Sequence, residues 1–143
     1  MNRNNEIVRK SNILQWWRVV RRWACKENDL SQGDMEFLIY LEPIDYFTMD
    51  DFKTGTFMLT WNNNRFWRMT KQGWITRIKK GRNERSRYVV SQKGKRLINR
   101  IYRILLREEP LPEGVASNKT MKREGFADKM YSQLIKKFNR DET

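Results

Sequence analysis

The sequence predicts a mainly α fold with a small β-hairpin (α+β). Over most of the chain, apolar residues recur at steps of three and four, which is the spacing of helices that bury one face. After Gly73 the pattern changes to two short runs rich in Ile, Val, Tyr and Trp, which is typical of strands. With 143 residues, 38% of them hydrophobic, the chain can bury one core, so we expect one compact domain with extensions.

The first predicted helix covers residues 7–27. Its apolar stripe consists of Ile13, Trp16, Trp17, Val20, Trp23 and Ala24, and its other face is basic through Arg9, Arg18, Arg21 and Arg22. Such a helix can lie on a membrane surface, or it can pack against its own domain or a partner subunit. We favour packing, and we assign residues 1–30 to dimerisation or packing through Trp16, Trp17, Val20 and Trp23.

A second helix is predicted to begin after Ser31. Ser31 is a suitable N-cap, and Asp34 three residues later is close to a capping box. Pro43 ends this helix, since the residue before a proline is disfavoured in a helical conformation. We expect its apolar residues to be Met35, Phe37, Leu38, Ile39 and Leu41.

Two more helices are predicted between Thr48 and residue 72. Thr48 caps a short helix whose first turn carries carboxylates, as the helix dipole favours, and Gly55 breaks it. Thr60 caps the next helix, over residues 60–72. We expect Trp67 and Trp74 to be core residues on either side of the hinge that follows.

A basic hairpin, a long helix and a separate C-terminal helix complete the predicted organisation. Residues 74–80 and 86–90 are the two strands of the hairpin, and Ser91 caps a helix with Leu97, Ile98, Ile101, Tyr102, Leu105 and Leu106 on its inner face. Residues 108–120 form a linker by their Pro, Gly and Ser content. The last helix spans about residues 121–139 and carries Met121, Phe126, Met130, Leu134 and Phe138. The central domain is thus 31–107, and residues 121–143 serve dimerisation or partner docking.

Positive charge is concentrated in one segment. The net charge is +13 and the isoelectric point is near 10.2. Residues 57–107 carry fifteen Lys and Arg residues against one Glu, so this segment holds the whole excess. A block of one sign indicates a polyanionic partner, and nucleic acid is the partner we favour.

Several motifs together resemble a winged helix-turn-helix of the MarR family. They are LSQGDMEFLIYL, FTMDDF, the helix closing in KQGWI, the hairpin ITRIKKGRNERSRYVV, and VSQKGKRLI, and they cover about residues 28–106. In that family they correspond to the helix before the reading pair, the first reading helix, the recognition helix, the wing and the helix after it. The resemblance implies a two-fold dimer formed by the terminal helices, with two recognition helices one DNA turn apart.

The predicted recognition helix has a polar exposed face. With Phe66 at the centre of the buried face, Asn62, Met69 and Thr70 fall on the same side at about 100° per residue, and Asn63 falls at its edge. Trp61, Asn64 and Arg68 fall on the opposite side, and Arg65, Lys71 and Gln72 fall beside them. These six residues are the predicted DNA contacts, with Asn63 as a further candidate.

Each candidate has a chemical role. Asn64 suits adenine, Arg65 and Arg68 suit guanine, and Lys71 suits phosphate. Trp61 can stack on sugar and a thymine methyl or can pack on its own protein. On the wing, the basic residues Lys79, Lys80, Arg82, Arg85 and Arg87 would follow the DNA backbone or enter a narrow minor groove.

Other classes of function are disfavoured. The chain has no histidine to act as a general base, and its acidic residues Asp45, Asp50 and Asp51 lack a companion set for two metals, so we expect no enzyme. Cys25 stands alone, so we expect no metal site of the Cys/His kind and no cofactor. No apolar run is long enough for a transmembrane helix, and residues 1–10 do not resemble a secretory signal. We therefore expect an intracellular protein without a membrane partner, located in the cytoplasm or nucleoid. Its gene can belong to a cell, a virus or a phage.

Two hypotheses of function remain. The first is a dimeric transcriptional regulator that binds double-stranded DNA, with the recognition helix 60–72 in the major groove and the wing 79–87 on the backbone or minor groove. The alternative is a winged-helix protein that binds nucleic acid without sequence preference, or that acts as a scaffold in replication, packaging, or virion or polymerase assembly. Phosphate binding needs charge alone, so charge does not separate the two.

Overall fold

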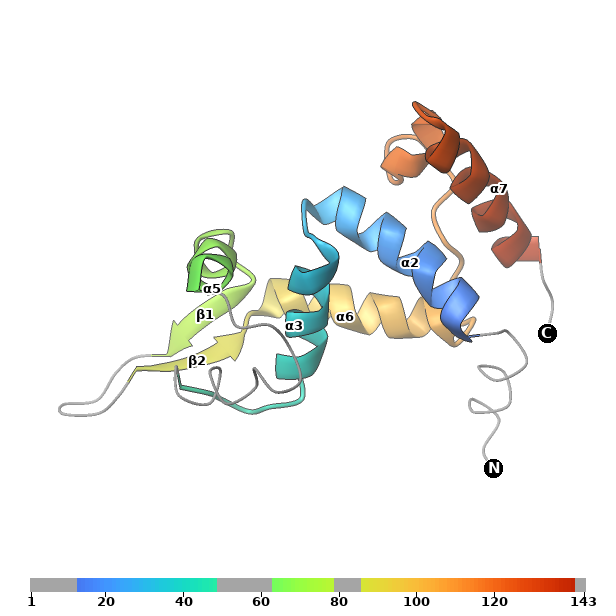
Figure 1. The fold of residues 1–143 in the computed structure, drawn as a ribbon. Coiled ribbons are helices and arrows are strands. Elements are labelled where there is room, and N and C mark those ends of the chain that lie inside the picture. Colours follow the sequence, from blue (N-terminus) through green and yellow to red (C-terminus); the bar gives the residue numbers. More distant parts are fainter. Residues whose placement is uncertain (1–12, 49–62, 79–85, 141–143) are drawn as a thin grey trace. The chain divides into compact units, whose positions relative to one another are not determined.

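The computed structural model describes residues 13–48, 63–78 and 86–140 (Figure 1). These residues form mainly helices and one antiparallel hairpin of two strands, which confirms the predicted α+β class. The chain divides into two compact units, a hairpin unit, Ser31–Asn99, and a terminal-helix unit, Met1–Leu30 with Arg100–Thr143. Residues 13–30 and 100–140 therefore belong to one unit.

Parts of the predicted elements lie outside the described residues. These parts are residues 7–12 of the first helix, most of the short helix that begins at Thr48, the predicted N-cap Thr60, and the hairpin tip at 79–85. The observed helices and strands are therefore compared with the predictions only within the three described ranges.

Helix α3, Gln32–Leu41, opens the hairpin unit at the predicted N-cap. The Asp34 N–H donates to the Ser31 hydroxyl at 3.1 Å, and the Ser31 N–H donates to the Asp34 carboxylate at 3.0 Å. This reciprocal pair is a capping box, which satisfies N–H groups that the first turn of a helix leaves open. The helix ends shortly before Pro43, as predicted, and it buries Met35, Phe37, Leu38 and Leu41.

Helix α5, Asn63–Lys71, ends at Gly73, whose φ of 90° lies in the left-handed region that favours glycine. The Gly73 N–H donates to the Thr70 carbonyl at 3.1 Å. The Trp74 N–H donates to the Met69 carbonyl at 2.9 Å. These two hydrogen bonds form a Schellman motif, which stops the helix and turns the chain directly into the first strand.

Strands β1, Ile75–Ile78, and β2, Arg87–Val90, pair antiparallel and confirm the predicted hairpin, with shorter strands than expected. Phe47 adds an isolated bridge to Tyr88 through two backbone hydrogen bonds of 2.8 Å. The sequence pattern does not predict this bridge, because a single paired residue leaves no alternation to detect. The bridge ties the segment after α3 to the hairpin.

Helix α6, Gln92–Leu105, begins where the hairpin ends. The Ser91 hydroxyl accepts a hydrogen bond from the Gly94 N–H at 3.1 Å and donates one to the Gly73 carbonyl at 2.6 Å. Ser91 is therefore the predicted cap, and it also joins the end of α5 to the start of α6. A Cβ atom on Gly94 would lie 2.6 Å from a methyl group of Val90, so only glycine allows this close approach.

The inner face of α6 differs from the prediction at Tyr102, which is exposed. The buried stripe consists of Leu97, Ile98, Ile101 and Ile104. Since Tyr102 lies about 100° around the helix from Ile101, the stripe passes it and continues at Ile104. Leu105 and Leu106, also predicted on the inner face, are half-buried.

An aromatic cluster forms part of the core of the hairpin unit. Phe66 meets Tyr88 edge to face at a centroid distance of 4.9 Å, and Phe47 stacks on Tyr88 at 6.1 Å. Trp74 is buried, as predicted. The prediction that Trp67 is a core residue is wrong, because its side chain is 51% exposed. Trp67 lies about 100° around α5 from Phe66, beyond the arc that the core covers.

The terminal-helix unit contains α2, Ile13–Asn28, and α7, Phe126–Arg140. Trp16 meets Phe138 edge to face at 5.3 Å, and the Trp23 indole N–H donates to the Ser117 carbonyl at 3.1 Å. Trp16, Val20 and Trp23, which the sequence assigns to a dimer or partner contact, are thus buried within their own chain. Trp17 is half-buried.

The predicted linker and last helix need correction. Residues 119–122 form a short 3₁₀ helix, η2, Lys119–Lys122, and α7 begins at Phe126 rather than at residue 121. The reason is Arg123, which adopts a left-handed conformation with φ of 56° and ends η2. Leu111 and Asn118 are buried, so the predicted linker 108–120 contributes to the core of this unit.

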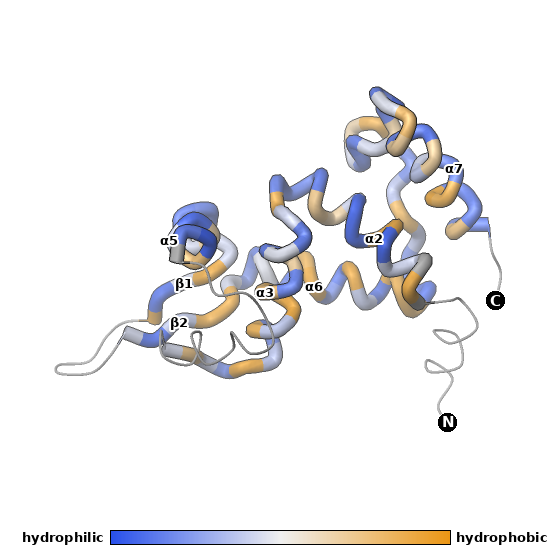
Figure 2. The backbone as a smooth tube through the Cα atoms, in the orientation of Figure 1, coloured by the Kyte–Doolittle hydropathy of each residue, from blue (hydrophilic) through white to orange (hydrophobic). Residues whose placement is uncertain are grey.

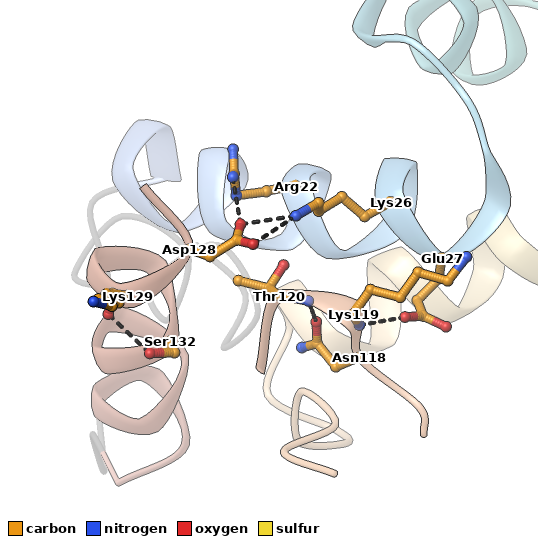
Figure 3. Close-up of polar contacts among 9 residues, drawn as sticks. All are labelled: Arg22, Lys26, Glu27, Asn118, Lys119, Thr120, Asp128, Lys129 and Ser132. Carbon is orange, nitrogen blue, oxygen red and sulfur yellow. Dashed lines mark hydrogen bonds and ion pairs between the residues drawn. The ribbon is translucent and has the colours of Figure 1, made fainter. Parts of the chain in front are cut away.

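The buried face of α7 also differs from the predicted stripe, and the tube coloured by hydropathy alternates along this helix (Figure 2). Phe126 is 80% exposed and Met130 is exposed as well, whereas Ile135 and Phe138 are buried. Leu134 is half-buried. The core face instead includes polar residues, because Asp128 binds Arg22 and Lys26 of α2 (Figure 3).

Candidate nucleic-acid interface

One row of exposed side chains runs along α5. Asn64, Trp67, Arg68 and Lys71 are all exposed, and their spacing of three, one and three residues places them along one side of the helix. We call these four residues the α5 row. Figure 2 shows α5 as largely hydrophilic, in keeping with this surface. An amide, an indole, a guanidinium and an ammonium group are thus presented side by side.

Trp67 is supported by the core beneath it, although much of its surface is exposed. Its ring meets Phe66 edge to face at 4.9 Å and Tyr88 at 6.4 Å. These contacts restrict the indole, so a ligand meets a rigid apolar surface with little rotamer freedom left to lose. An exposed tryptophan among cations is suited to contact with a base or a sugar.

Arg65 and Arg68 both bind the carboxylate of Asp34 on α3. The Arg65 Nε donates to Asp34 Oδ1 at 2.8 Å, and Arg68 Nη2 donates to the same oxygen. The side chain of Asp34 is only 1% exposed, while those of Arg65 and Arg68 are 20% and 50% exposed. A buried carboxylate needs such partners, because an unpaired charge away from water is costly.

Arg65 is enclosed on several sides. Its guanidinium lies over the Phe37 ring at 5.2 Å. It also fills the space where a side chain on Gly33 would be, since a Cβ there would lie 2.6 Å from Arg65 Nη2. Arg65 was expected to read a base, but these contacts direct it to the α3 surface. Arg68 remains the more accessible guanidinium of the two.

The remaining predicted residues of the recognition helix are placed less favourably or are not described. Asn63 is the first residue of α5, and its side chain is not among those the structure describes. Trp61 precedes the described part of this helix. Gln72 is half-buried, and its backbone carbonyl accepts a hydrogen bond from Lys93 Nζ at 2.9 Å.

Two arginines mark the described ends of the hairpin. Arg87, predicted as a wing contact, is exposed on β2 and lies over the Tyr46 ring at 4.8 Å. Arg77 is exposed on β1 and pairs in register with Tyr88. The other predicted wing contacts, Lys79, Lys80, Arg82 and Arg85, belong to the hairpin tip and lie outside the described residues.

Three residues that form or support this surface are missing from the sequence-based set. Trp67 could be found from the helical wheel, which places it about 100° from Phe66. Arg77 could not be found from strand alternation, which places it on the same face as the buried Ile75 although its side chain is exposed. Asp34 could not be found, since its capping role is local while its partners are 31 and 34 residues away.

The arrangement can contact each chemical part of a duplex. Amide and guanidinium groups match the donor and acceptor patterns of base edges in the major groove, and cations match phosphates. An indole face can contact a thymine methyl or a sugar. Of the acidic residues considered for a nuclease, Asp45 is exposed, and Asp50 and Asp51 lie outside the described residues.

The described helices include none with the length and apolar character needed to cross a membrane. No protein-family model, curated protein or solved structure matches the chain.

Proposed function

We propose that the chain binds double-stranded DNA through α5 and the hairpin, as a transcriptional regulator of the MarR-like winged-helix type. The observation that carries this proposal is the α5 row, Asn64, Trp67, Arg68 and Lys71, on a short helix that leads into a basic hairpin. A helix of this size fits the major groove, and the hairpin that follows would then lie near the backbone.

Each member of the row has a distinct task in the proposed complex. Asn64 would form a bidentate pair with adenine and Arg68 with guanine. Trp67 would contact a thymine methyl, and Lys71 would bind phosphate. On the hairpin, Arg77 and Arg87 extend the basic surface toward the phosphates, together with the predicted tip residues.

The local fold supports the same proposal. The Schellman motif at Gly73 and the Ser91 hydroxyl hold the end of α5, the base of the hairpin and the start of α6 together. Such a rigid base fixes α5 and the two strands as one body. A reading helix placed on rigid elements keeps its side chains in register with the bases.

Association of two copies remains part of the proposal. Phe126 and Met130 are exposed one turn apart on α7, and exposed apolar side chains that adjoin one another can mark a contact between chains. Their exposure supports a homodimer or docking on another protein. Light scattering at micromolar concentration separates a dimer from a monomer, and a monomer in the presence of a two-fold symmetric duplex would contradict the dimer.

The alternative function, binding without sequence preference or a scaffold role, is favoured by a different observation. Arg65 is directed to Asp34, and Arg77 and Arg87 lie on the strands, so a large part of the described positive charge is placed for phosphates rather than bases. Binding of that kind depends on counterion release and falls steeply with salt.

One experiment separates the two. Bound fragments are selected from random double-stranded DNA, and the affinity of the enriched duplex is measured by fluorescence anisotropy over a range of salt concentrations. Regulation predicts an enriched motif with two-fold symmetry, and Asn64→Ala should relax one position by about 1 to 3 kcal/mol. Lys71→Ala should weaken all duplexes similarly and reduce the salt slope by about one.

A matched control comes from the other unit. Lys129→Ala and Gln133→Ala remove an exposed cation and an exposed amide from α7. They therefore remove the same kinds of group as Lys71→Ala and Asn64→Ala, but from another helix. We expect both to bind DNA like the parent chain. An unenriched pool with strong salt dependence supports the alternative, and equal effects of the α5 and α7 variants would rule out the α5 row as the interface.

A further inference from the structure

Asp34 is a buried carboxylate that binds two arginines of the helix proposed to contact DNA. We propose that Asp34 is a positioning residue that holds the Arg68 guanidinium in the orientation needed to read guanine. This inference rests on the proposed DNA binding, and it adds a residue of α3 that does not itself touch the bases. Its basis is the shared oxygen Oδ1, which accepts from both Arg65 Nε and Arg68 Nη2.

The position of Asp34 is fixed independently of Arg68. Oδ2 accepts the Ser31 N–H at 3.0 Å as part of the capping box, and Oδ1 accepts Arg65 Nε at 2.8 Å. Arg65 is in turn held by the Phe37 ring and by the space above Gly33. Asp34 is thus a rigid acceptor, and Arg68 is the partner with a half-exposed side chain that this acceptor can orient.

Guanine recognition requires this kind of orientation. Arginine reads guanine through two coplanar N–H groups that meet O6 and N7 together, whereas a phosphate accepts a cation in many orientations. A long side chain loses rotamer freedom when it is fixed. Because Asp34 fixes Arg68 during folding, that loss does not have to occur again on binding.

The charge balance argues against a role in phosphate binding. Asp34 brings one negative charge next to two positive ones, so it weakens the attraction of this part of α5 for a polyanion. A surface that served phosphate binding alone would bind more tightly without it. The presence of Asp34 therefore predicts opposite effects on guanine preference and on overall affinity when the carboxylate is removed.

The test uses the full chain and a duplex selected from random DNA. At the position where guanine is enriched, guanine is replaced by 7-deazaguanine, which lacks the N7 acceptor. The ratio of the two Kd values then measures guanine reading. We expect a ratio of roughly tenfold for the parent chain, within the range for one bidentate pair.

Asp34→Asn is the informative variant, because the amide oxygen can still accept the Ser31 N–H while the charge is lost. We expect the ratio to fall to about twofold or less, and the affinity for the 7-deazaguanine duplex to stay equal or to rise. In an Arg68→Ala background, Asp34→Asn should leave the ratio unchanged, since the two residues act through one contact. The matched control is Asp128→Asn, which removes a buried carboxylate that also binds two cations, and its ratio should equal that of the parent chain.

Three results would overturn the inference. The first is an Asp34→Asn chain that folds and keeps the parent ratio, which would leave Asp34 with a structural role only. The second is a selected pool in which no position favours guanine, although DNA is bound. The third is free rotation of the Arg68 guanidinium in the parent chain, measured by NMR of the arginine side chains. This measurement decides the question even if Asp34→Asn does not fold. Failure to bind any duplex would instead remove the proposed function itself.

Discussion

Asp34 and Asp128 are two buried carboxylates that occupy equivalent chemical settings in the two units of the chain. Each binds two basic side chains of another helix, Arg65 and Arg68 on α5 in one case, and Arg22 and Lys26 on α2 in the other. Both carboxylates lie in the first turn of their own helices, where the helix dipole favours negative charge.

The difference lies in what the cations do beyond the ion pair. In the terminal-helix unit, Arg22 also lies over the Tyr131 ring at 4.6 Å, so its second contact is again with α7. In the hairpin unit, Arg65 has similar packing but Arg68 is half-exposed in the α5 row. The same set of charges therefore joins two helices in one unit, and in the other it also presents a guanidinium on the surface.

The largest effect is expected from Asp128→Ala. This change leaves Arg22 and Lys26 beside a buried site without a neutralising charge, and we expect the free energy of unfolding to fall by about 2 to 4 kcal/mol. The loss should be measured by urea denaturation, with hydrogen exchange to locate it in α2 and α7. Glu124→Ala removes an exposed carboxylate of the same unit and serves as control. Equal losses for the two variants would show that the Asp128 cluster does not join the helices.

The second prediction compares a closely packed glycine, Gly94, with an open one, Gly125. Gly94→Ala places a Cβ 2.6 Å from a Val90 methyl and 3.2 Å from the Trp74 carbonyl oxygen. We expect a loss of about 1 to 3 kcal/mol in the free energy of unfolding, although alanine is the better helix former. Gly125→Ala is the control, since its Cβ would meet nothing within 4 Å. A Gly94→Ala chain as stable as the control would mean that α6 shifts without cost.

The third prediction compares the Asp34 and Asp128 clusters by removing one cation from each. Arg68→Ala and Arg22→Ala each remove one cation from a buried carboxylate that keeps its other partner. Only Arg68→Ala should weaken binding to the selected duplex, by about 1 to 3 kcal/mol, because only Arg68 is proposed to meet a base. Fluorescence anisotropy on both variants measures this. A comparable loss of affinity with Arg22→Ala would place the DNA surface on both units or on neither.

The smallest effect concerns pH and the terminal-helix unit. Burial raises the pKa of Asp128, but hydrogen bonds and charges from Lys26 and Arg22 outweigh it and hold the pKa below its ordinary value of 3.8. A lowered folded-state pKa means that the carboxylate stabilises the fold above pH 3.8 and that this contribution is lost as the pH falls through the folded-state pKa.

This contribution can be isolated although another group titrates nearby. Hydrogen bonding to Arg100 lowers the pKa of Glu109 in the same unit, so the parent chain alone would report both carboxylates. The difference in unfolding free energy between the parent chain and Asp128→Asn should therefore be followed by urea denaturation between pH 7 and pH 2. We expect it to shrink below pH 3.8. A constant difference would show that the charge of Asp128 contributes nothing.

Local signals in the sequence predicted much of the fold. The capping box at Ser31 and the end of α5 near Gly73 depend on neighbours within a few residues, so residue type and spacing indicated them. The start of α7 could not be predicted, because it depends on the left-handed conformation of Arg123, a residue that rarely adopts it. The polar core face around Asp128 was missed because an apolar stripe is the expected signature of burial.

The candidate surface was predictable in outline and less so in detail. The charge block and the helical wheel indicated Asn64, Arg68 and Lys71, and all three are exposed in the structure. The wheel placed Arg68 opposite Phe66 and Arg65 beside it, but it could not show that Arg65 packs on Phe37 and Gly33 or that both arginines bind Asp34, because these partners are far away in sequence. Charge counting treats every cation alike, whereas the packing around each cation decides how far it reaches the surface.

The Ser91 hydroxyl has a consequence for which parts of the hairpin can change in sequence or length. By donating to the Gly73 carbonyl and accepting from the Gly94 N–H, it brings the entry and exit of segment 74–90 to one point. One side chain therefore joins Gly73, which precedes the first strand, to the first turn of α6. Changes in the length or composition of the far end of the hairpin need not be transmitted to α5 or α6.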